Sequence, residues 1–443
     1  MSPKWKLNGA AARPDVLRAL EPSHAFGSTV RTGVFEFTLA PSAAAFNVVE
    51  VKTPGMSATL TVRPFPSSIE KDDWFRILLC SCFHQAENHQ ALLAKTYQNI
   101  PSSQRQDLSL FMGDQVYLDL PTLNNYPDDS AKLAERFETY YRTNWTTVLG
   151  LEPLFNAAPS VFCPDDHEYW NNFPHVSPII QNSWKKASRD RWKVPADQLY
   201  DAFQSTPPAA RGDNIAVDIA PLSVMVLDQR SQRQEDRSAT LAPSGLQQLN
   251  DWVDRLIAER KIGAVVTGQS LLDKPVSEYQ GTVADWVLSN YGDYESVVKA
   301  LQRLAEAGRP VLLLTGDVHW GRVTRIKEGG RTKFIEIVCS PSSLVTTIGS
   351  DQLKSIGAGF RKFFKGEETR WPRHSSPPDA EPFFAPQVFG KRYRTDVVHK
   401  QTGDQLAMLA FRRAGGEIEA KVTYYEIHER PNRPKEIKLG LMR

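Results

Sequence analysis

The sequence lacks any run of about 18 apolar residues, so it predicts no membrane-spanning helix. Its N-terminal segment holds neither the apolar core of a secretory signal nor two adjacent arginines. We therefore expect a cytoplasmic protein, unless an export signal has been removed.

The chain also lacks an excess of charge of either sign. The chain has 53 basic and 51 acidic side chains, which gives a net charge of +2. No long run of either sign occurs, so we expect neither a nucleic-acid-binding patch nor a polybasic membrane patch. A local basic pocket for a small anionic substrate needs only a few Arg or Lys and is not excluded.

Cysteine is scarce, with four residues in a chain of 443. This number is too small for a disulfide scaffold. Cys80, Cys163 and Cys339 each lie at or near the end of an apolar segment, where buried thiols are expected. Cys82 has a different context and is treated with the site residues below.

The length favours a large catalytic domain preceded by a smaller region. Strand-like segments separated by a Pro54-Gly55 turn lie between about residues 29 and 65, so we interpret residues 1–72 as a β-rich accessory region. Residues 73–443 form the predicted main domain, in which 346–400 resembles a lid-like insertion and 401–443 a C-terminal β-hairpin.

Short apolar runs without alternation recur after Trp74, as in strands that are buried on both faces. The runs end at or near Ser81, Asp114, Asp166, Asp228, Gln269, Asp317 and Ser340. Helices are predicted over 244–261, with Ser244 as the N-cap, and over 297–307. This alternation predicts a layered α/β domain.

Polar clusters follow several of these runs, at the strand ends where α/β sheets bind ligands. The clusters are Ser81-Cys82-Phe83-His84, Gly113-Asp114-Gln115-Val116-Tyr117, Asp165-Asp166-His167-Glu168 and Gly316-Asp317-Val318-His319. A Gly-Asp pair alone is a common turn. Four ionisable residues directly after an apolar run are rarer, because burying them requires partners or a metal.

Such a set suits phosphate-ester hydrolysis, which develops negative charge on the phosphate oxygens and on the leaving oxygen. Two cations a few ångströms apart stabilise that charge and lower the pKa of a bound water. Several carboxylates are needed to hold them, one of them shared. The glycines at 113 and 316 allow the backbone to turn close to the metals.

The order of the motifs resembles the alkaline phosphatase D (PhoD) family of metallophosphoesterases. The matching segments are Ser81-Cys82, GDQVY at 113–117, DDHEYWNN at 165–172, LDQRSQR at 227–233 and GDVHWG at 316–321. The resemblance covers about residues 75–345. It implies an α/β fold in which a two-sheet metallophosphoesterase sandwich is flanked by helices and preceded by a small β-rich region.

The resemblance also implies roles for individual residues. The implied metal ligands are Cys82, Asp114, Tyr117, Asp166, Asp317 and His319, with Asp114 as the bridging carboxylate. The implied catalytic residues are His167 as proton donor, Asp166 and Asn171. Arg230 and Arg233 are expected to contact the substrate phosphate, since planar guanidinium groups suit two oxygens.

Two details depend on this chain's own residues. The wider superfamily places an Asp-x-His pair where this chain has Cys82-Phe83-His84, so His84 is either an extra ligand or a surface histidine. Asp165, Asp166 and Glu168 are expected to orient His167 and to keep its ring protonated.

The ligand set is rich in oxygen and poor in histidine, which suits iron, calcium, manganese or magnesium. The resemblance points to Fe³⁺ with Ca²⁺. The sequence thus predicts a phosphatase or phosphodiesterase with a small phosphate-ester substrate. The alternatives are a non-catalytic scaffold that keeps the fold and another metal hydrolase, although the HExxH pattern is absent. Substrate identity and oligomeric state stay open.

Overall fold

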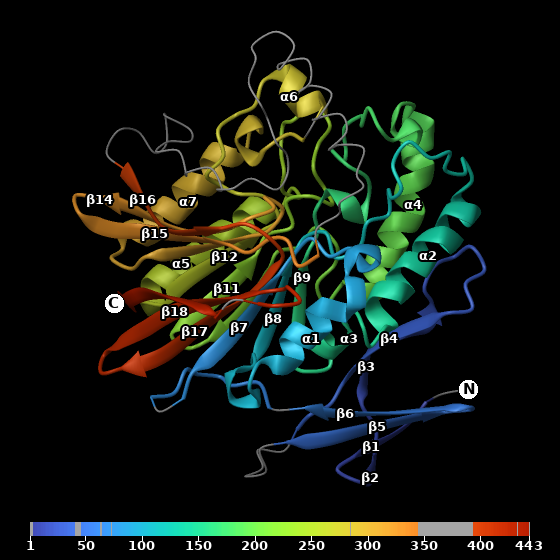
Figure 1. Cartoon of the computed structure of the whole chain (residues 1–443), viewed down its shortest axis with the longest axis horizontal. Helices are drawn as coiled ribbons and strands as arrows, with labels where there is room; N and C mark the ends of the chain where they lie inside the picture. The colour runs from blue at the N-terminus through green and yellow to red at the C-terminus, as the bar shows by residue number, and fades with distance from the viewer. Residues whose placement is uncertain are drawn as a thin grey trace.

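The computed structural model describes residues 3–39, 46–62, 64–71, 73–283, 285–343, 393–431 and 433–442. Two large mixed sheets pack face to face, helices cover their outer sides, and a smaller β region precedes them (Figure 1). This architecture confirms the predicted two-sheet α/β sandwich.

The first large sheet has the strand order β19-β18-β17-β7-β8-β9. Its strands are β7 (Phe75–Cys80), β8 (Leu108–Met112), β9 (Ser160–Cys163), β17 (Gln405–Ala414), β18 (Glu417–Glu426) and β19 (Lys435–Met442). β7, β8 and β9 run parallel to one another, and β17 joins β7 in antiparallel fashion.

The second large sheet has the order β10-β11-β12-β13-β15-β14-β16. Its strands are β10 (Ile215–Ile219), β11 (Leu222–Val226), β12 (Ile262–Thr267), β13 (Val311–Thr315), β14 (Gly321–Glu328), β15 (Arg331–Val338) and β16 (Tyr393–Gln401). β11, β12, β13 and β15 are parallel neighbours. The seven apolar runs correspond to β7, β8, β9, β11, β12, β13 and β15. A strand covered on both faces is mostly apolar, because both sets of its side chains pack against other elements.

The helices lie outside this core. They are α1 (Leu92–Asn99), α2 (Ser130–Thr146), α3 (Glu152–Phe155), α4 (Lys186–Phe203), α5 (Gly245–Glu259), α6 (Glu278–Val283) and α7 (Tyr294–Glu306). Short 3-10 turns occupy Gln85–Glu87, His89–Ala91, Ser102–Gln104, Asp166–Glu168, Gln181–Ser183 and Leu288–Asn290. No helix in the described part of the chain is long and apolar enough to cross a membrane.

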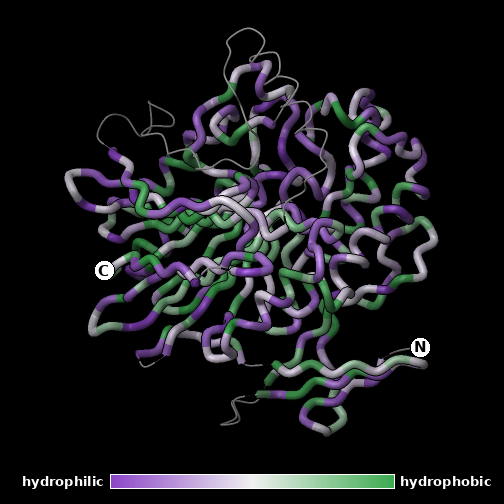
Figure 2. The backbone as a smooth tube through the Cα atoms, viewed as in Figure 1, coloured by the Kyte–Doolittle hydropathy of each residue, from purple (hydrophilic) through white to green (hydrophobic). Residues whose placement is uncertain are grey.

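The main core fills the space between the two sheets. Leu110 and Leu409 from the first sheet pack in one cluster with Val224, Val266 and Leu314 from the second. Apolar segments are concentrated in these strands (Figure 2). A second cluster joins α5 and α7 to the outer face of the second sheet. Burial of this apolar surface holds the two sheets in fixed relation, and with them the loops that follow their strands.

The N-terminal region consists of β strands, in agreement with the predicted character of 1–72. A four-stranded antiparallel sheet contains β1 (Lys4–Leu7), β2 (Ala10–Ala12), β5 (Asn47–Thr53) and β6 (Met56–Val62). A separate ribbon of β3 (Asp15–Pro22) and β4 (Arg31–Glu36) reaches α4, where Arg18 Nη2 donates to the carbonyl of Ala202 at 2.8 Å. The ribbon thereby fastens this region to the main body.

Some local expectations differ from the structure. Ser244 does precede α5, but its side chain makes no capping hydrogen bond. Of the predicted lid, 346–392 lie outside the described residues, whereas Tyr393–Gln401 form strand β16 instead of an irregular segment. The predicted C-terminal hairpin corresponds to β17 and β18, and β19 adds a third strand beside them.

Candidate metal centre

The predicted ligands meet at one edge of the sandwich because they follow the carboxyl ends of parallel strands. Cys82 follows β7, Asp114 follows β8, Asp166 follows β9 and Asp317 follows β13. The first three strands belong to one sheet and β13 to the other, so the site is assembled across both sheets.

Three overlapping groups of side chains have spacings that could hold cations. They are Cys82 with Asp317 and His319, Asp114 with Asp166 and His167, and Asp165 with Asp166 and Asp317. Within each group the ligand atoms lie within 4.8 Å of one another. Asp166 and Asp317 each belong to two groups, so the three groups form one continuous cluster.

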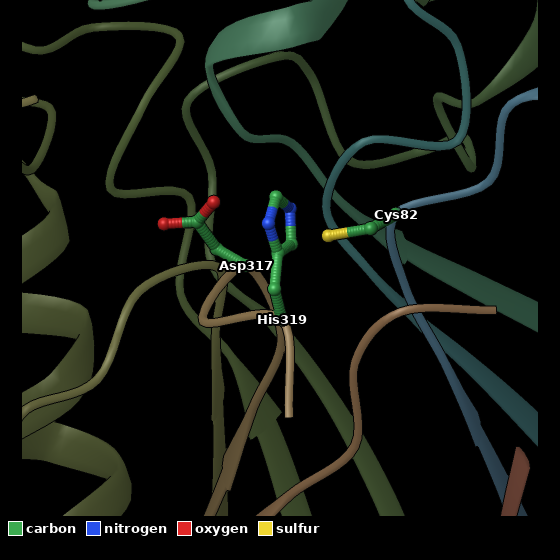
Figure 3. Close-up of side chains that lie close together, drawn as sticks. All are labelled: Cys82, Asp317 and His319. Carbon is green, nitrogen blue, oxygen red and sulfur yellow. The ribbon is translucent and has the colours of Figure 1, made fainter. Parts of the chain in front are cut away.

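The thiol side of this cluster is built by Cys82, Asp317 and His319. The Cys82 sulfur points toward the His319 ring, and the Asp317 carboxylate lies on the other side of that ring (Figure 3). Cys82 is fully buried, and Ser340 Oγ donates to its sulfur at 3.2 Å.

Asp114 lies between the thiol and the second group of carboxylates. Its Oδ2 is 3.4 Å from the Cys82 sulfur, and its Oδ1 accepts the backbone N–H of His167 at 3.3 Å. Asp114 also belongs to the ligand group with Asp166. One carboxylate therefore faces both halves of the cluster, which is the position that a bridging ligand requires.

Tyr117 has a buried phenol whose Oη has no hydrogen-bond partner among the described residues. Its ring centroid lies 4.3 Å from that of His167. Burial raises the pKa of Tyr117, and the nearby Cys82 and Asp114 raise it further. A buried hydroxyl is costly without a partner, and a cation would supply one.

Electrostatic repulsion among the carboxylates also favours a cation. Burial is the main cause that raises the pKa of Asp317, and the charges of Asp165 and Asp166 add to it. Burial likewise raises the pKa of Asp114 and raises that of Asp165 to about 6. Bound cations would reverse this effect, because they stabilise the ionised carboxylates. The residues present therefore fit a metal centre of hard or borderline cations.

Backbone strain is concentrated at the same place. Cys82, Asp114, Asp317 and His319 have φ angles of 52°, 59°, 50° and 59°, in the left-handed region that residues with a Cβ rarely adopt. Each such residue costs on the order of 1–3 kcal/mol, and such strain tends to occur at functional sites.

The two predicted glycines are required by close approach. A Cβ on Gly113 would lie 2.7 Å from the Asp165 Cβ, and one on Gly316 would lie 2.0 Å from the carbonyl oxygen of Met112. Neither contact is compatible with a side chain. The glycines therefore let the loops of β8 and β13 approach their neighbours closely.

His167 is oriented by a residue that the sequence did not reveal. Its Nδ1 lies 2.9 and 3.0 Å from the two carboxylate oxygens of Asp119, which is fully buried. Burial alone would lower the pKa of His167, but Asp119, Asp166 and Asp114 outweigh it and raise the pKa. The prediction that Asp165 and Glu168 orient this ring is therefore wrong, since the ring nitrogen faces Asp119.

Glu168 instead links the loop after β8 to the loop after β9. Its Oε2 accepts the backbone N–H of Asp114 at 3.1 Å and of Asp165 at 2.8 Å, and its Oε1 accepts that of Gln115 at 2.7 Å. Burial raises the pKa of Glu168 to about 7, although these three donors oppose the shift. One fully buried carboxylate thus fixes the loop after β8 relative to the loop after β9.

Arg230 is enclosed by acceptors of the protein itself. Its Nε donates to Asp165 at 2.6 Å, its Nη2 to Asp285 at 2.8 Å and its Nη1 to the carbonyl of Phe173 at 2.8 Å. Only 1% of its surface is exposed. Asp285 was not identified from the sequence, because no local motif marks it.

Arg233 donates to uncharged acceptors. They are the carbonyls of Gln229 at 2.9 Å and Trp286 at 3.3 Å, and Gln269 Oε1 at 2.9 Å. The structure thus brings both predicted arginines next to the acidic cluster. Their contact with a substrate phosphate stays a prediction.

Asn171 and His84 flank the cluster. Asn171 donates its backbone N–H to Asp119 at 2.7 Å, and its side-chain oxygen accepts from Ser177 at 3.2 Å. His84 lies edge-on to Tyr117 with 5.7 Å between ring centroids, and its buried Nδ1 has no partner among the described residues. His84 is partly buried, and its role as a ligand stays a prediction.

A sandwich of two mixed sheets with this acidic edge has a metallophosphatase-like fold. The chain belongs to the PhoD-like phosphatase family, whose pattern matches residues 77–370. This match confirms the resemblance derived from the motifs. No curated protein matches the chain.

Solved structures with a similar fold include one described as the structure of PhoD. Its TM-score is 0.61 at 12% identity, over 99% of this chain and 85% of that chain. A dimetal phosphatase from Danio rerio has a TM-score of 0.38 at 8% identity, over 83% of this chain and 98% of that one. GAP50, the anchor in the inner membrane complex of Plasmodium, has a TM-score of 0.41 at 10% identity, over 84% and 90%.

Proposed function

We propose that this chain hydrolyses phosphate esters as a metal-dependent phosphatase or phosphodiesterase with a dinuclear centre. The observation that carries this proposal is the place of Asp114, which lies 3.4 Å from the Cys82 sulfur on one side and shares a ligand group with Asp166 on the other. A shared carboxylate with ligands on both sides supports two adjacent cations better than one. Membership of the PhoD-like phosphatase family supports the same reaction class.

Cys82, Asp114, Tyr117 and His319 would hold one cation, and Asp114 would bridge to the other. Asp166 and Asp317 would complete the second position, where Asp165 offers a further carboxylate that the sequence had not suggested as a ligand. A pair of bound cations supplies a water of lowered pKa and neutralises phosphate oxygens. The oxygen-rich ligand set suits iron, calcium, manganese or magnesium, and the family resemblance points to Fe³⁺ with Ca²⁺.

His167 would serve as the proton donor to the leaving oxygen. The Asp119 carboxylate holds its Nδ1, which leaves Nε2 as the nitrogen that can face the substrate. The surrounding carboxylates favour the protonated ring. Asn171 would act through this pair, because its backbone N–H donates to Asp119.

Arg233 and Arg230 would set the charge around the substrate phosphate. Arg230 donates hydrogen bonds to Asp165 and Asp285, so it would act on the site by orienting the Asp165 carboxylate. Arg233 donates to uncharged acceptors, so less of its charge is compensated by its partners. The positive charge of Arg233 would therefore stabilise a phosphate bound beside the cluster.

Elemental analysis combined with turnover of an aryl phosphate tests this proposal. The expected result is two bound metal ions per chain and hydrolysis that is lost on chelation and restored by metal. Full metal content without turnover of phosphomonoesters or phosphodiesters would instead favour a scaffold that keeps the fold. The matched control is Asp251→Asn, an exposed aspartate on α5 remote from the cluster.

A further inference from the structure

A large cavity lies at the end of the sandwich opposite the metal cluster. Its volume is about 510 Å³, within the range of roughly 300–1,000 Å³ typical of small-molecule sites. Its wall includes Phe75 at the start of β7, Asp107 just before β8 and Ser160 at the start of β9. The cavity therefore lies at the amino ends of strands whose carboxyl ends carry the metal cluster, roughly 15 Å away along β8.

The cavity is formed jointly by the accessory region and the main body. Leu60 and Val62 of β6 line one side, and Trp145, Phe155 and Phe203 from the helical layer line the other. The four-stranded accessory sheet lies next to these strand ends (Figure 1). The cavity exists only when both parts of the chain are in place.

Aromatic rings dominate the inner wall. The Trp145 ring lies 5.1 Å from that of Phe155 and 6.0 Å from that of Phe203. All three are only half-buried, so part of each faces the cavity. On the outer side Phe65 is 38% exposed and packs edge-on to Phe75 at 6.1 Å. Faces of aromatic rings carry negative charge density and attract cations.

The charged side chains among the described residues of the cavity wall are all acidic. Glu70, Asp73 and Asp107 line it, and none of the described residues in its wall is a lysine, arginine or histidine. Asp73 lies at the mouth with 83% of its side chain exposed, and pairs with Arg76, outside the wall, at 3.6 Å. Arg412 and Lys421 lie over the Trp74 ring of this wall, and the carboxylates that line the cavity itself favour a cation over a phosphate or another anion.

We propose that this cavity binds a small organic cation with an apolar body, namely an alkyl- or arylammonium. The rings of Trp145, Phe155 and Phe203 contact the body and the cationic head, and the carboxylates at the mouth complement the positive charge. The site is independent of the metal cluster and of the proposed hydrolysis.

Isothermal titration calorimetry with three probes of matched shape tests the proposal. The probes are 2-phenylethylammonium, 2-phenylethanol and phenylacetate, and the protein is the full chain. We expect the ammonium to bind about tenfold more tightly than the alcohol, and phenylacetate to show no binding. Binding of the alcohol or phenylacetate as tight as that of the ammonium overturns the proposal, as does binding of none of the three.

Two variants locate the binding. Ala158 lines the cavity, so Ala158→Trp fills it and should abolish binding of the ammonium. Asp73→Asn should weaken ammonium binding about threefold and leave alcohol binding unchanged, because an exposed charge contributes modestly. Asp251→Asn on α5 serves as the control and should match the unaltered chain. Undiminished ammonium binding in Ala158→Trp would place the cation elsewhere and refute the site. The readout needs no turnover, so it can fail while the proposed function holds.

Discussion

The Nδ1 atom of His167 lies 2.9 Å from Oδ1 of Asp119, and both side chains are buried. The contact joins residues that are 48 positions apart. It fixes the ring so that Nε2 is the nitrogen available to a substrate, and the negative charge of Asp119 favours the protonated form.

His167→Ala should therefore slow esters with poor leaving groups most. We expect a loss of about 10²–10⁴-fold on alkyl phosphates and a much smaller loss on nitrophenyl phosphates, whose leaving group needs little protonation. Asp119→Asn should show the same dependence to a smaller degree. Steady-state kinetics on both substrates measures the effect. Equal losses on both, with unchanged metal content, would reject the proton-donor role.

Asp114→Asn and Asp317→Asn should each reduce turnover below a few per cent while the fold survives. Each substitution removes a negative charge from the cluster and leaves the main core between the sheets intact. Metal content per chain, circular dichroism and aryl-phosphate turnover are the measurements, with Asp251→Asn as the control. Substantial activity at full metal content would contradict the bridging role of Asp114.

Glu168→Gln should destabilise the site although it preserves the size of the side chain. Three backbone N–H groups point at the Glu168 carboxylate, and the amide of glutamine would turn its NH₂ toward at least one of them. We expect the free energy of unfolding to fall by about 2 kcal/mol, measured by urea denaturation. Glu135→Gln, an exposed position on α2, is the matched control. Equal unfolding midpoints for the two variants would exclude Glu168 as a clamp between the loops.

The four cysteines should be unreactive in the folded protein. All four are free and buried, and burial raises the pKa of the Cys80 thiol to about 12. At pH 8 only about one Cys80 thiol in ten thousand is then a thiolate, the form that reacts. Ellman's reagent should label four thiols after denaturation and none rapidly before it. Ser57→Cys, at an exposed position of β6, provides a fast-reacting reference. A rapidly labelled thiol in the unaltered native chain would contradict this.

Active protein should contain iron or calcium and not a pair of zinc ions. The cluster offers oxygen ligands and one thiol but few histidines, which suits harder cations. A bond between Tyr117 and ferric iron would give the solution a visible colour, and that colour should disappear in Tyr117→Phe. Two zinc ions and no iron or calcium in a fully active sample would refute this assignment.

The strands that build the site could be predicted because a strand buried on both faces is a short apolar run in the sequence. The apolar runs before Asp114 and Asp317 became β8 and β13, and the polar residues after them meet at one edge. β16 was missed because most of its residues are only half-buried and its composition is polar. Such a strand is determined by its pairing with β14, which no local pattern reveals.

The second layer of the site could not be predicted for a related reason. Asp119 and Asp285 acquire their roles only when folding brings them to His167 and Arg230, 48 and 55 positions away. Nothing in the residues around them distinguishes these aspartates from those of surface turns. Glu168 lies within a recognised motif, but its carboxylate accepts hydrogen bonds from backbone N–H groups. Every residue except proline has such a group, so the sequence does not indicate which ones it contacts.

The order of the strands around β7 has a consequence for biosynthesis. β7 delivers Cys82, yet one of its two neighbours is β17, which begins at Gln405. Until β17 has been synthesised, the edge of β7 that will pair with it has no hydrogen-bond partner, and the sheet is incomplete. The thiol end of the metal cluster thus gains its final support only after the segment Gln405–Ala414 has emerged. A premature stop before β17 would leave all the predicted ligands in the product but would expose that edge to other chains.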